Sequence, residues 1–150
     1  MTETTKDTIA IACDHGGYEM KLALIEDLRK TGCALLDLGA DSEESVDYPD
    51  YAYKLAKAIK NGEADRGILI CGSGIGISIA ANRYPEIRAA LVTDGLSAAL
   101  SRRHNDANVM VLGGRLTGIE TARDCLNKFL TTDFEGGRHA RRVNKLSSPE

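Results

Sequence analysis

The segment GILICGSGIG, residues 67–76, decides the fold of this chain. Its first half, residues 67–71, is an apolar run with the length of a buried β-strand. The glycines that follow allow a tight turn, and the sequence predicts a helix directly after them, over residues 76–82. A strand, a turn and a helix in this order form the repeating unit of open α/β sheets.

The same alternation extends in both directions from this segment. Short apolar runs predict four further strands, over residues 8–13, 34–38, 88–92 and 109–112. Segments of helical period predict helices over residues 18–30, 51–60, 95–104, 119–130 and, after Gly136–Gly137, 138–146. Because most of these strands are apolar throughout, helices should cover both faces of a parallel sheet. The predicted fold is α/β: a single Rossmann-like three-layer domain over residues 1–150, with a five-stranded parallel sheet.

The composition is that of an ordinary globular chain. It has 150 residues, of which 43% are hydrophobic and 27% charged. A net charge of −3 gives no electrostatic reason to expect nucleic acid. No apolar run approaches the ~20 residues that span a bilayer, and the N-terminal MTETTKDT does not resemble a signal peptide. We therefore expect a cytoplasmic protein that binds neither nucleic acid nor a membrane.

The cysteines show no pattern of a disulfide framework or a zinc site. The four are widely separated, without a C-x-x-C pair and without histidine at zinc-like spacing: Cys13, Cys33, Cys71 and Cys125. Cys33 and Cys125 lie in apolar contexts and are expected to be small buried hydrophobic residues. Cys71 is different, because it ends a strand just before a helix, where backbone N–H groups favour a thiolate.

Ligands of open α/β sheets bind outside the carboxyl ends of the strands, near a topological switch point. Candidate residues follow the first and third predicted strands: Asp14, His15, Gly72, Ser73, Gly74 and Gly76. The backbone N–H groups of the glycine turn suit an anion or an oxyanion. The alternatives are a plain turn capped by Asp14 and a glycine packing turn with a structural Cys71.

Further candidates lie in the second half of the chain. His104 and Asn105 precede the fifth predicted strand, although a histidine in a last helical turn also interacts with the helix dipole. Arg138 and Arg142 are spaced i,i+4 and could grip a phosphate together, or form a solvated basic face. His139 lies on another face of that helix and is expected to have no role.

The glycine turn also allows a nucleotide-binding interpretation. It reads G-x-G-x-G rather than G-x-G-x-x-G and follows the third strand rather than the first. Asp94 stands 18 residues after Gly76, roughly where a ribose-binding acid would be. A non-catalytic nucleotide-binding module is therefore an alternative.

Six short motifs resemble, in order, the type B ribose-5-phosphate isomerases, whose relatives include galactose-6-phosphate isomerase subunits. They are Cys13-Asp14-His15-Gly16, Asp47-Tyr48-Pro49, GILICGSG at 67–74, Ile79-Ala80-Ala81-Asn82, Ser101-Arg102-Arg103-His104-Asn105-Asp106 and Glu135-Gly136-Gly137-Arg138-His139. The resemblance runs from about residue 9 to about residue 146. It implies interconversion of ribose 5-phosphate and ribulose 5-phosphate in the pentose phosphate pathway, without a metal or an organic cofactor. The same chemistry on allose 6-phosphate, galactose 6-phosphate or a tetrose phosphate is an alternative.

The resemblance also implies roles for individual residues. Cys71 would be the base that moves a proton between C2 and C1, because Ile77 stands where other members of the family carry a glutamate. Ser73, often threonine in the family, would stabilise the enediolate, and His104 would open the sugar ring with help from Asp14. The expected sugar and phosphate contacts are Tyr48, Asn105, His15, Arg115, Arg138 and Arg142. A homodimer or tetramer is implied, with His104, Asn105 and Arg115 reaching in from the partner.

Overall fold

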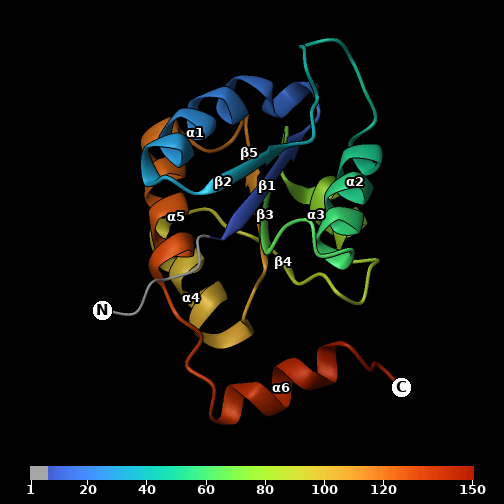
Figure 1. Ribbon diagram of the computed structural model, residues 1–150, viewed down its shortest axis with the longest axis vertical. Coiled ribbons are helices and arrows are strands. Elements are labelled where there is room, and N and C mark those ends of the chain that lie inside the picture. The colour runs from blue at the N-terminus through green and yellow to red at the C-terminus, as the bar shows by residue number, and fades with distance from the viewer. Residues whose placement is uncertain (1–6) are drawn as a thin grey trace.

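The computed structural model describes residues 7–150 and shows a three-layer α/β fold around one parallel sheet (Figure 1). The strands are β1 (Thr8–Cys13), β2 (Ala34–Asp37), β3 (Arg66–Cys71), β4 (Ala89–Leu91) and β5 (Val109–Gly113). The helices are α1 (Tyr18–Thr31), α2 (Tyr48–Lys60), α3 (Ile75–Ala81), α4 (Gly95–Asn105), α5 (Ile119–Thr131) and α6 (Arg138–Leu146). Residues 1–6, on which part of the signal-peptide prediction rests, lie outside the described residues.

The predicted strands and helices are all confirmed, and the largest boundary error lies at α2. This helix begins at Tyr48 instead of residue 51, because Pro49 fits the first turn of a helix, where no backbone N–H is needed. A short 3-10 turn, η1 (His15–Gly17), precedes α1 and was not predicted. Asp94 caps α4 by accepting a hydrogen bond from the N–H of Ser97 at 2.7 Å, so its position reflects helix capping and gives no support to nucleotide binding.

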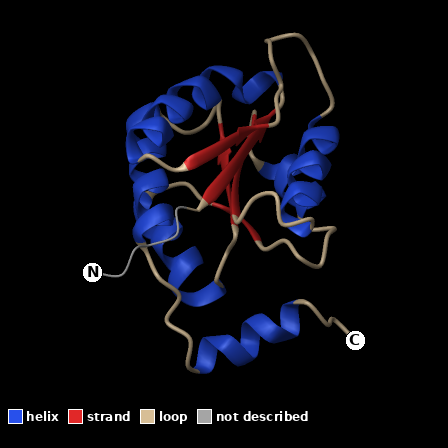
Figure 2. Cartoon of the chain, in the orientation of Figure 1, coloured by secondary structure: helices blue, strands red, loops and turns tan. Residues whose placement is uncertain are grey.

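Two apolar cores lie on the two faces of the sheet. Helices α1, α4 and α5 cover one face, and α2 and α3 cover the other (Figures 1 and 2). The central strands β1, β3 and β5 are buried almost throughout, as their composition predicts. Strands β2 and β4 form the edges and stay partly exposed, although side chains of both strands still pack against the apolar cores on the two faces.

The strand order β2-β1-β3-β5-β4 places the topological switch point between β1 and β3. The turns that follow these two strands are in direct contact. The N–H of Asp14 donates to the carbonyl of Ile70 at 3.2 Å, and a Cβ on Gly16 would lie 3.0 Å from the backbone nitrogen of Gly72. The predicted residues after β1 and β3 therefore lie together at the carboxyl end of the sheet, where the parallel strands finish.

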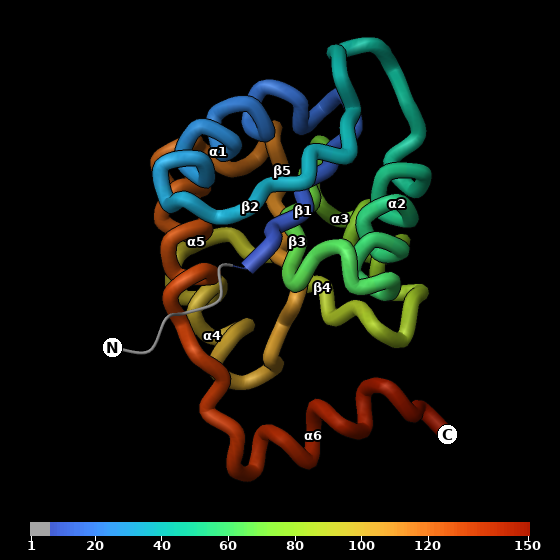
Figure 3. The backbone as a smooth tube through the Cα atoms, viewed as in Figure 1, coloured from blue at the N-terminus to red at the C-terminus, as the bar shows by residue number. Residues whose placement is uncertain are grey.

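Helix α6 stands apart from the two layers of helices. The tube in Figure 3 shows it beyond the amino ends of the strands, next to the end of α4. Its outer surface is exposed, including Leu146 at 60%. Among residues 7–150, no helix combines the length and the apolar composition needed to cross a bilayer.

The four cysteines are free thiols in different surroundings. Cys125 is buried, as predicted, whereas Cys33 is only half-buried. Burial raises the pKa of the Cys13 and Cys125 thiols to about 11, so both stay protonated at neutral pH.

Candidate active site

The turn after β3 directs backbone N–H groups at two candidate side chains. The N–H of Gly74 donates to Sγ of Cys71 at 3.2 Å, and the N–H of Ile75 donates to Oγ of Ser73 at 3.2 Å. Gly74 has φ +80°, a backbone conformation that a side chain would strain. The turn thus requires glycine there, and it supplies donors that stabilise negative charge next to Cys71 and Ser73.

The turn after β1 places a buried carboxylate beside this thiol. Asp14 is only 6% exposed and accepts a hydrogen bond from the N–H of Gly16 at 2.8 Å. Asp14 and Cys71 line the same cleft. A carboxylate and a thiol therefore lie in one cleft at the switch point.

His15 is oriented by a backbone hydrogen bond from a distant loop. The N–H of Val46 donates to Nδ1 of His15 at 3.2 Å, so Nδ1 is an acceptor and Nε2 carries the ring proton. Buried Lys21 helps to hold this loop, because its Nζ donates to Oδ1 of Asp37 at 2.8 Å and to the carbonyl of Ala40 at 2.7 Å. Neither Lys21 nor Val46 belongs to a predicted motif, because their contacts arise only on folding.

A cleft of about 540 Å³ at the carboxyl ends of the strands brings Asp14, Cys71 and Ser73 together, whereas His15 does not line it. Its lining comprises Asp14, Tyr48, Cys71, Gly72, Ser73, Ile75, Gly76, Arg115 and Leu116. Tyr48 packs on Gly76, where a Cβ would lie 2.6 Å from its Cζ. The N–H of Arg115 donates to the carbonyl of Gly72 at 2.9 Å. The expectation that Arg115 reaches in from a partner is therefore wrong, since it lines its own chain's cleft.

The remaining predicted residues lie at the opposite end of the sheet, where the strands begin. Helix α4 starts after β4 at the carboxyl end of the sheet and runs back, which places His104 and Asn105 beyond the amino ends of the strands. There they line a separate cavity of about 230 Å³ with Arg142, His139 and Val143. One chain thus divides the predicted site into two groups.

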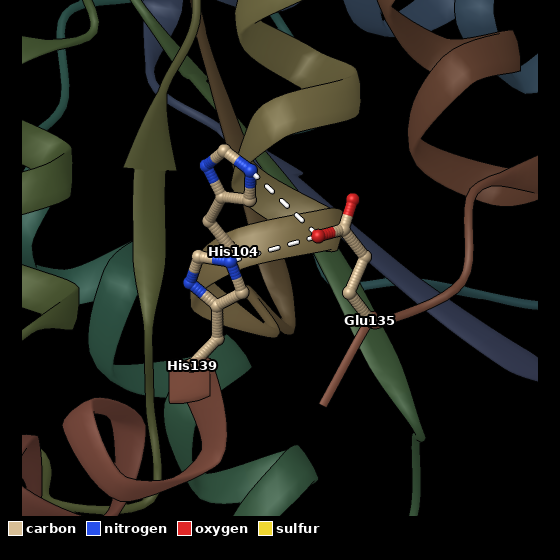
Figure 4. A group of neighbouring side chains, drawn as sticks. All are labelled: His104, Glu135 and His139. Atoms are coloured by element: carbon tan, nitrogen blue, oxygen red, sulfur yellow. Dashed lines mark ion pairs between the residues drawn. The ribbon is translucent and has the colours of Figure 1, made fainter. Parts of the chain in front are cut away.

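His139 was predicted to have no role, yet it contacts His104 directly. The two rings stack with centroids 4.3 Å apart and planes 13° from parallel, and His139 is only 8% exposed. Burial, His104 and Arg138 lower the pKa of His139, which favours the neutral ring. Oε1 of Glu135 lies near both rings (Figure 4). The i,i+4 spacing of Glu135 and His139 was the available signal in the sequence.

Arg138 and Arg142 both lie on the exposed side of α6. Within residues 7–150, neither guanidinium pairs with a carboxylate, in contrast to Arg102, which binds Asp106 at 2.9 Å. Two uncompensated cations one helical turn apart suit a phosphate, which arginine binds in fork geometry.

Comparisons with known proteins identify the family. A family model described as Ribose/Galactose Isomerase matches residues 9–146. The chain is 45% identical to ribose-5-phosphate isomerase B of Escherichia coli (strain K12), with 95% of each protein covered. The solved structure of ribose-5-phosphate isomerase B from Clostridium thermocellum is 50% identical, with a TM-score of 0.93 over 95% of this chain and 96% of that one. That of the Mycoplasma genitalium enzyme with bound ribulose-5-phosphate is 41% identical, with a TM-score of 0.88 and 93% of each chain covered. The chain belongs to the ribose/galactose isomerase family.

Proposed function

We propose that this chain interconverts ribose 5-phosphate and ribulose 5-phosphate. The observation that carries the proposal is the cleft at the switch point, which Cys71, Ser73 and Asp14 line together in a chain of this family. A free sugar phosphate is a metabolite of the cytoplasm, and we place the reaction there, in the pentose phosphate pathway.

Cys71 is the proposed base. Its thiolate takes the proton from C2 of the open-chain aldose, and C1 and C2 become an enediolate with the negative charge on O1. The proton on O2 passes to O1, and the proton held by Cys71 goes to C1 as the carbonyl forms at C2. The hydroxyl of Ser73 and the N–H groups of the glycine turn hold the oxygen that becomes negative. Every proton and electron pair stays within the substrate and these groups, so the step needs no cofactor.

Ring opening and phosphate binding call on both groups of residues. His104 donates a proton to the ring oxygen while Asp14 accepts one from the C1 hydroxyl. Tyr48 and Asn105 contact sugar hydroxyls. The phosphate set is His15, Arg115, Arg138 and Arg142, with His15 offering its Nε2–H. Since these residues occupy the carboxyl and amino ends of one sheet, we infer that a homodimer assembles each site from two chains.

The surface around the cleft supports a dimer. Two large apolar side chains that line it are exposed to solvent, Ile75 at 53% and Leu116 at 74%. Ile79 at 62%, Leu91 at 39% and Leu96 at 65% are also exposed, on α3, β4 and the start of α4. Exposed apolar side chains that gather on one surface are typical of a protein interface. In a two-fold dimer, the end of α4 and helix α6 of one copy would close the cleft of the other, giving two equal sites.

A six-carbon sugar phosphate is the second candidate, because the family model covers ribose and galactose isomerases alike. The nucleotide-binding alternative loses its main argument, since Asp94 is occupied as a helix cap.

The test is the turnover of ribose 5-phosphate, allose 6-phosphate and galactose 6-phosphate by the purified chain and by Cys71→Ser. Ribose 5-phosphate should give the highest kcat/KM, and Cys71→Ser should lower kcat at least about 100-fold because the base is lost. Cys33→Ser, which changes a thiol outside the cleft, is the matched control and should keep wild-type kcat. Activity confined to a six-carbon sugar would change the substrate, and substantial turnover by Cys71→Ser would remove Cys71 as the base.

A further inference from the structure

Three potential metal ligands face one another between the end of α4 and the start of α6. They are His104 on α4, Glu135 in the loop between α5 and α6, and His139 on α6 (Figure 4). Oε1 of Glu135 lies 3.6 Å from Nε2 of His139 and 4.0 Å from Nε2 of His104. One ligand atom from each residue lies within 4.8 Å of the other two.

These separations are close to those around a small cation. Zinc binds imidazole nitrogen at about 2.0–2.1 Å and carboxylate oxygen at about 2.0–2.2 Å, so two ligands of a tetrahedral ion lie roughly 3.4 Å apart. The Glu135 side chain is 51% exposed, and within residues 7–150 its carboxylate pairs only with the two histidines, so it can move the remaining distance. Burial holds His139 in place. The stacked rings are only 13° from parallel, so the half-exposed His104 ring must turn out of the stack before both Nε2 lone pairs can point at one ion.

We propose that His104, Glu135 and His139 bind one divalent transition-metal ion of the zinc type for each chain. Two imidazoles and one carboxylate form a ligand set that zinc uses, with a fourth position left for water or a sugar oxygen. Calcium and magnesium are disfavoured because they prefer sites made of oxygen alone. Arg138 and Arg142 repel a cation, so the ion binds reversibly and is not part of the folded framework.

A bound ion would act as an inhibitor of the proposed reaction, and this consequence rests on the proposed role of His104. A coordinated Nε2 of His104 carries no proton to give to the ring oxygen. The metal should therefore suppress turnover of cyclic ribose 5-phosphate. It should spare 4-deoxyribose 5-phosphate, which cannot form a furanose ring because it lacks the hydroxyl at C4.

The binding test uses chelator-treated protein titrated with Co²⁺, followed by visible absorption, and with Zn²⁺, followed by calorimetry. One ion per chain should bind, without the near-ultraviolet charge-transfer band of a cobalt–thiolate bond. Glu135→Gln and His139→Asn should each weaken binding at least about tenfold, because loss of a residue that only supports a metal ligand already costs about 10–100-fold. Glu135 is exposed, so Glu135→Gln keeps the test valid if His139→Asn is unstable.

His15→Asn and Cys71→Ser are the matched controls, because the chain has three histidines and the reactive thiol offers a competing ligand. Both should bind the ion with wild-type affinity. A thiolate band, unchanged binding by Glu135→Gln and His139→Asn, or loss of binding in either control would overturn the proposal. Turnover by the metal-free wild-type protein is measured separately, so failure of metal binding and failure of the proposed isomerase activity give different results.

Discussion

At the scale of single residues, the surroundings of each thiol decide whether it can react. Cys13 and Cys125 are fully buried, and the resulting rise in pKa keeps them protonated. Cys71 instead receives an N–H from Gly74 and opens onto a cleft. Position in the fold therefore separates the thiol that opens onto the cleft from two that are sealed in the core.

The buried Cys125 thiol makes stability depend on alkaline pH. Its pKa rises from 9.0 to about 11 on folding, so its contribution is complete below pH 9 and is lost as the pH rises towards 11. A shift of this size corresponds to about 2–3 kcal/mol. The difference in free energy of unfolding between wild type and Cys125→Ala should shrink by that amount from pH 9 to pH 11. Leu126→Ala, a neighbouring buried truncation without a titrating group, should show a constant difference, and parallel behaviour of the two variants would contradict the assignment.

His104→Asn tests ring opening apart from isomerisation. Loss of the proposed acid should lower kcat/KM for ribose 5-phosphate by about 100-fold. With 4-deoxyribose 5-phosphate, which stays open, kcat/KM should remain within about threefold of wild type, since the general-acid contribution is not needed. Equal losses on both substrates, measured by steady-state kinetics, would argue against a ring-opening role.

The sequence predicted the residues of the cleft better than their supports. Asp14, Cys71 and Ser73 could be found because strand ends and glycine turns are visible as local patterns. Lys21 could not, because it is a helical lysine buried by its partners. The spacing of His139 from Glu135 was visible, but its contact with His104, 35 positions away along the chain, was not. Such pairings depend on tertiary packing.

At the scale of the elements, local chemistry predicted nearly all strands and helices. The apolar runs and helical periods were sufficient because most elements bury one whole face or stripe. The strand order and the partial exposure of β2 and β4 did not follow, because pairing between strands is non-local. Nor could helical period alone show that α6 stands off the sheet.

Gly113 at the end of β5 leaves room for the turn after β3. A Cβ there would lie 2.6 Å from the carbonyl oxygen of Ser73, which is backbone and cannot swing away. Gly113→Ala should lower stability by about 1–3 kcal/mol and kcat at least about tenfold, because it displaces the Ser73 turn. Gly118→Ala, where a Cβ meets nothing within 4 Å, should keep kcat and lose at most about 1 kcal/mol at the start of α5. Urea unfolding and kinetics on both variants check this, and equal effects would refute it.

At the scale of the whole molecule, one chain holds the two halves of the proposed site at opposite ends of its strands. The cleft with Cys71 and Arg115 lies at the carboxyl end of the sheet, and the cavity with His104 and Arg142 lies at the amino end. The sequence could not show this separation, because order along the chain does not reveal which end of the sheet a residue reaches. The proposed homodimer reunites the two halves, and it requires that each site use residues of both copies.

Mixing two inactive variants tests this requirement most directly. Cys71→Ser damages the cleft, and His104→Asn damages the cavity at the amino end of the sheet. Random reassembly makes half of the dimers mixed. In each mixed dimer, the intact cleft of one chain meets the intact His104 of the other, which gives one fully intact site. Activity on ribose 5-phosphate should therefore return to about one quarter of wild type. A mixture of Cys71→Ser with Arg115→Ala, both in one cleft, should recover nothing. If the first mixture stays at the average of its two inactive parents, each site belongs to a single chain and the account is wrong.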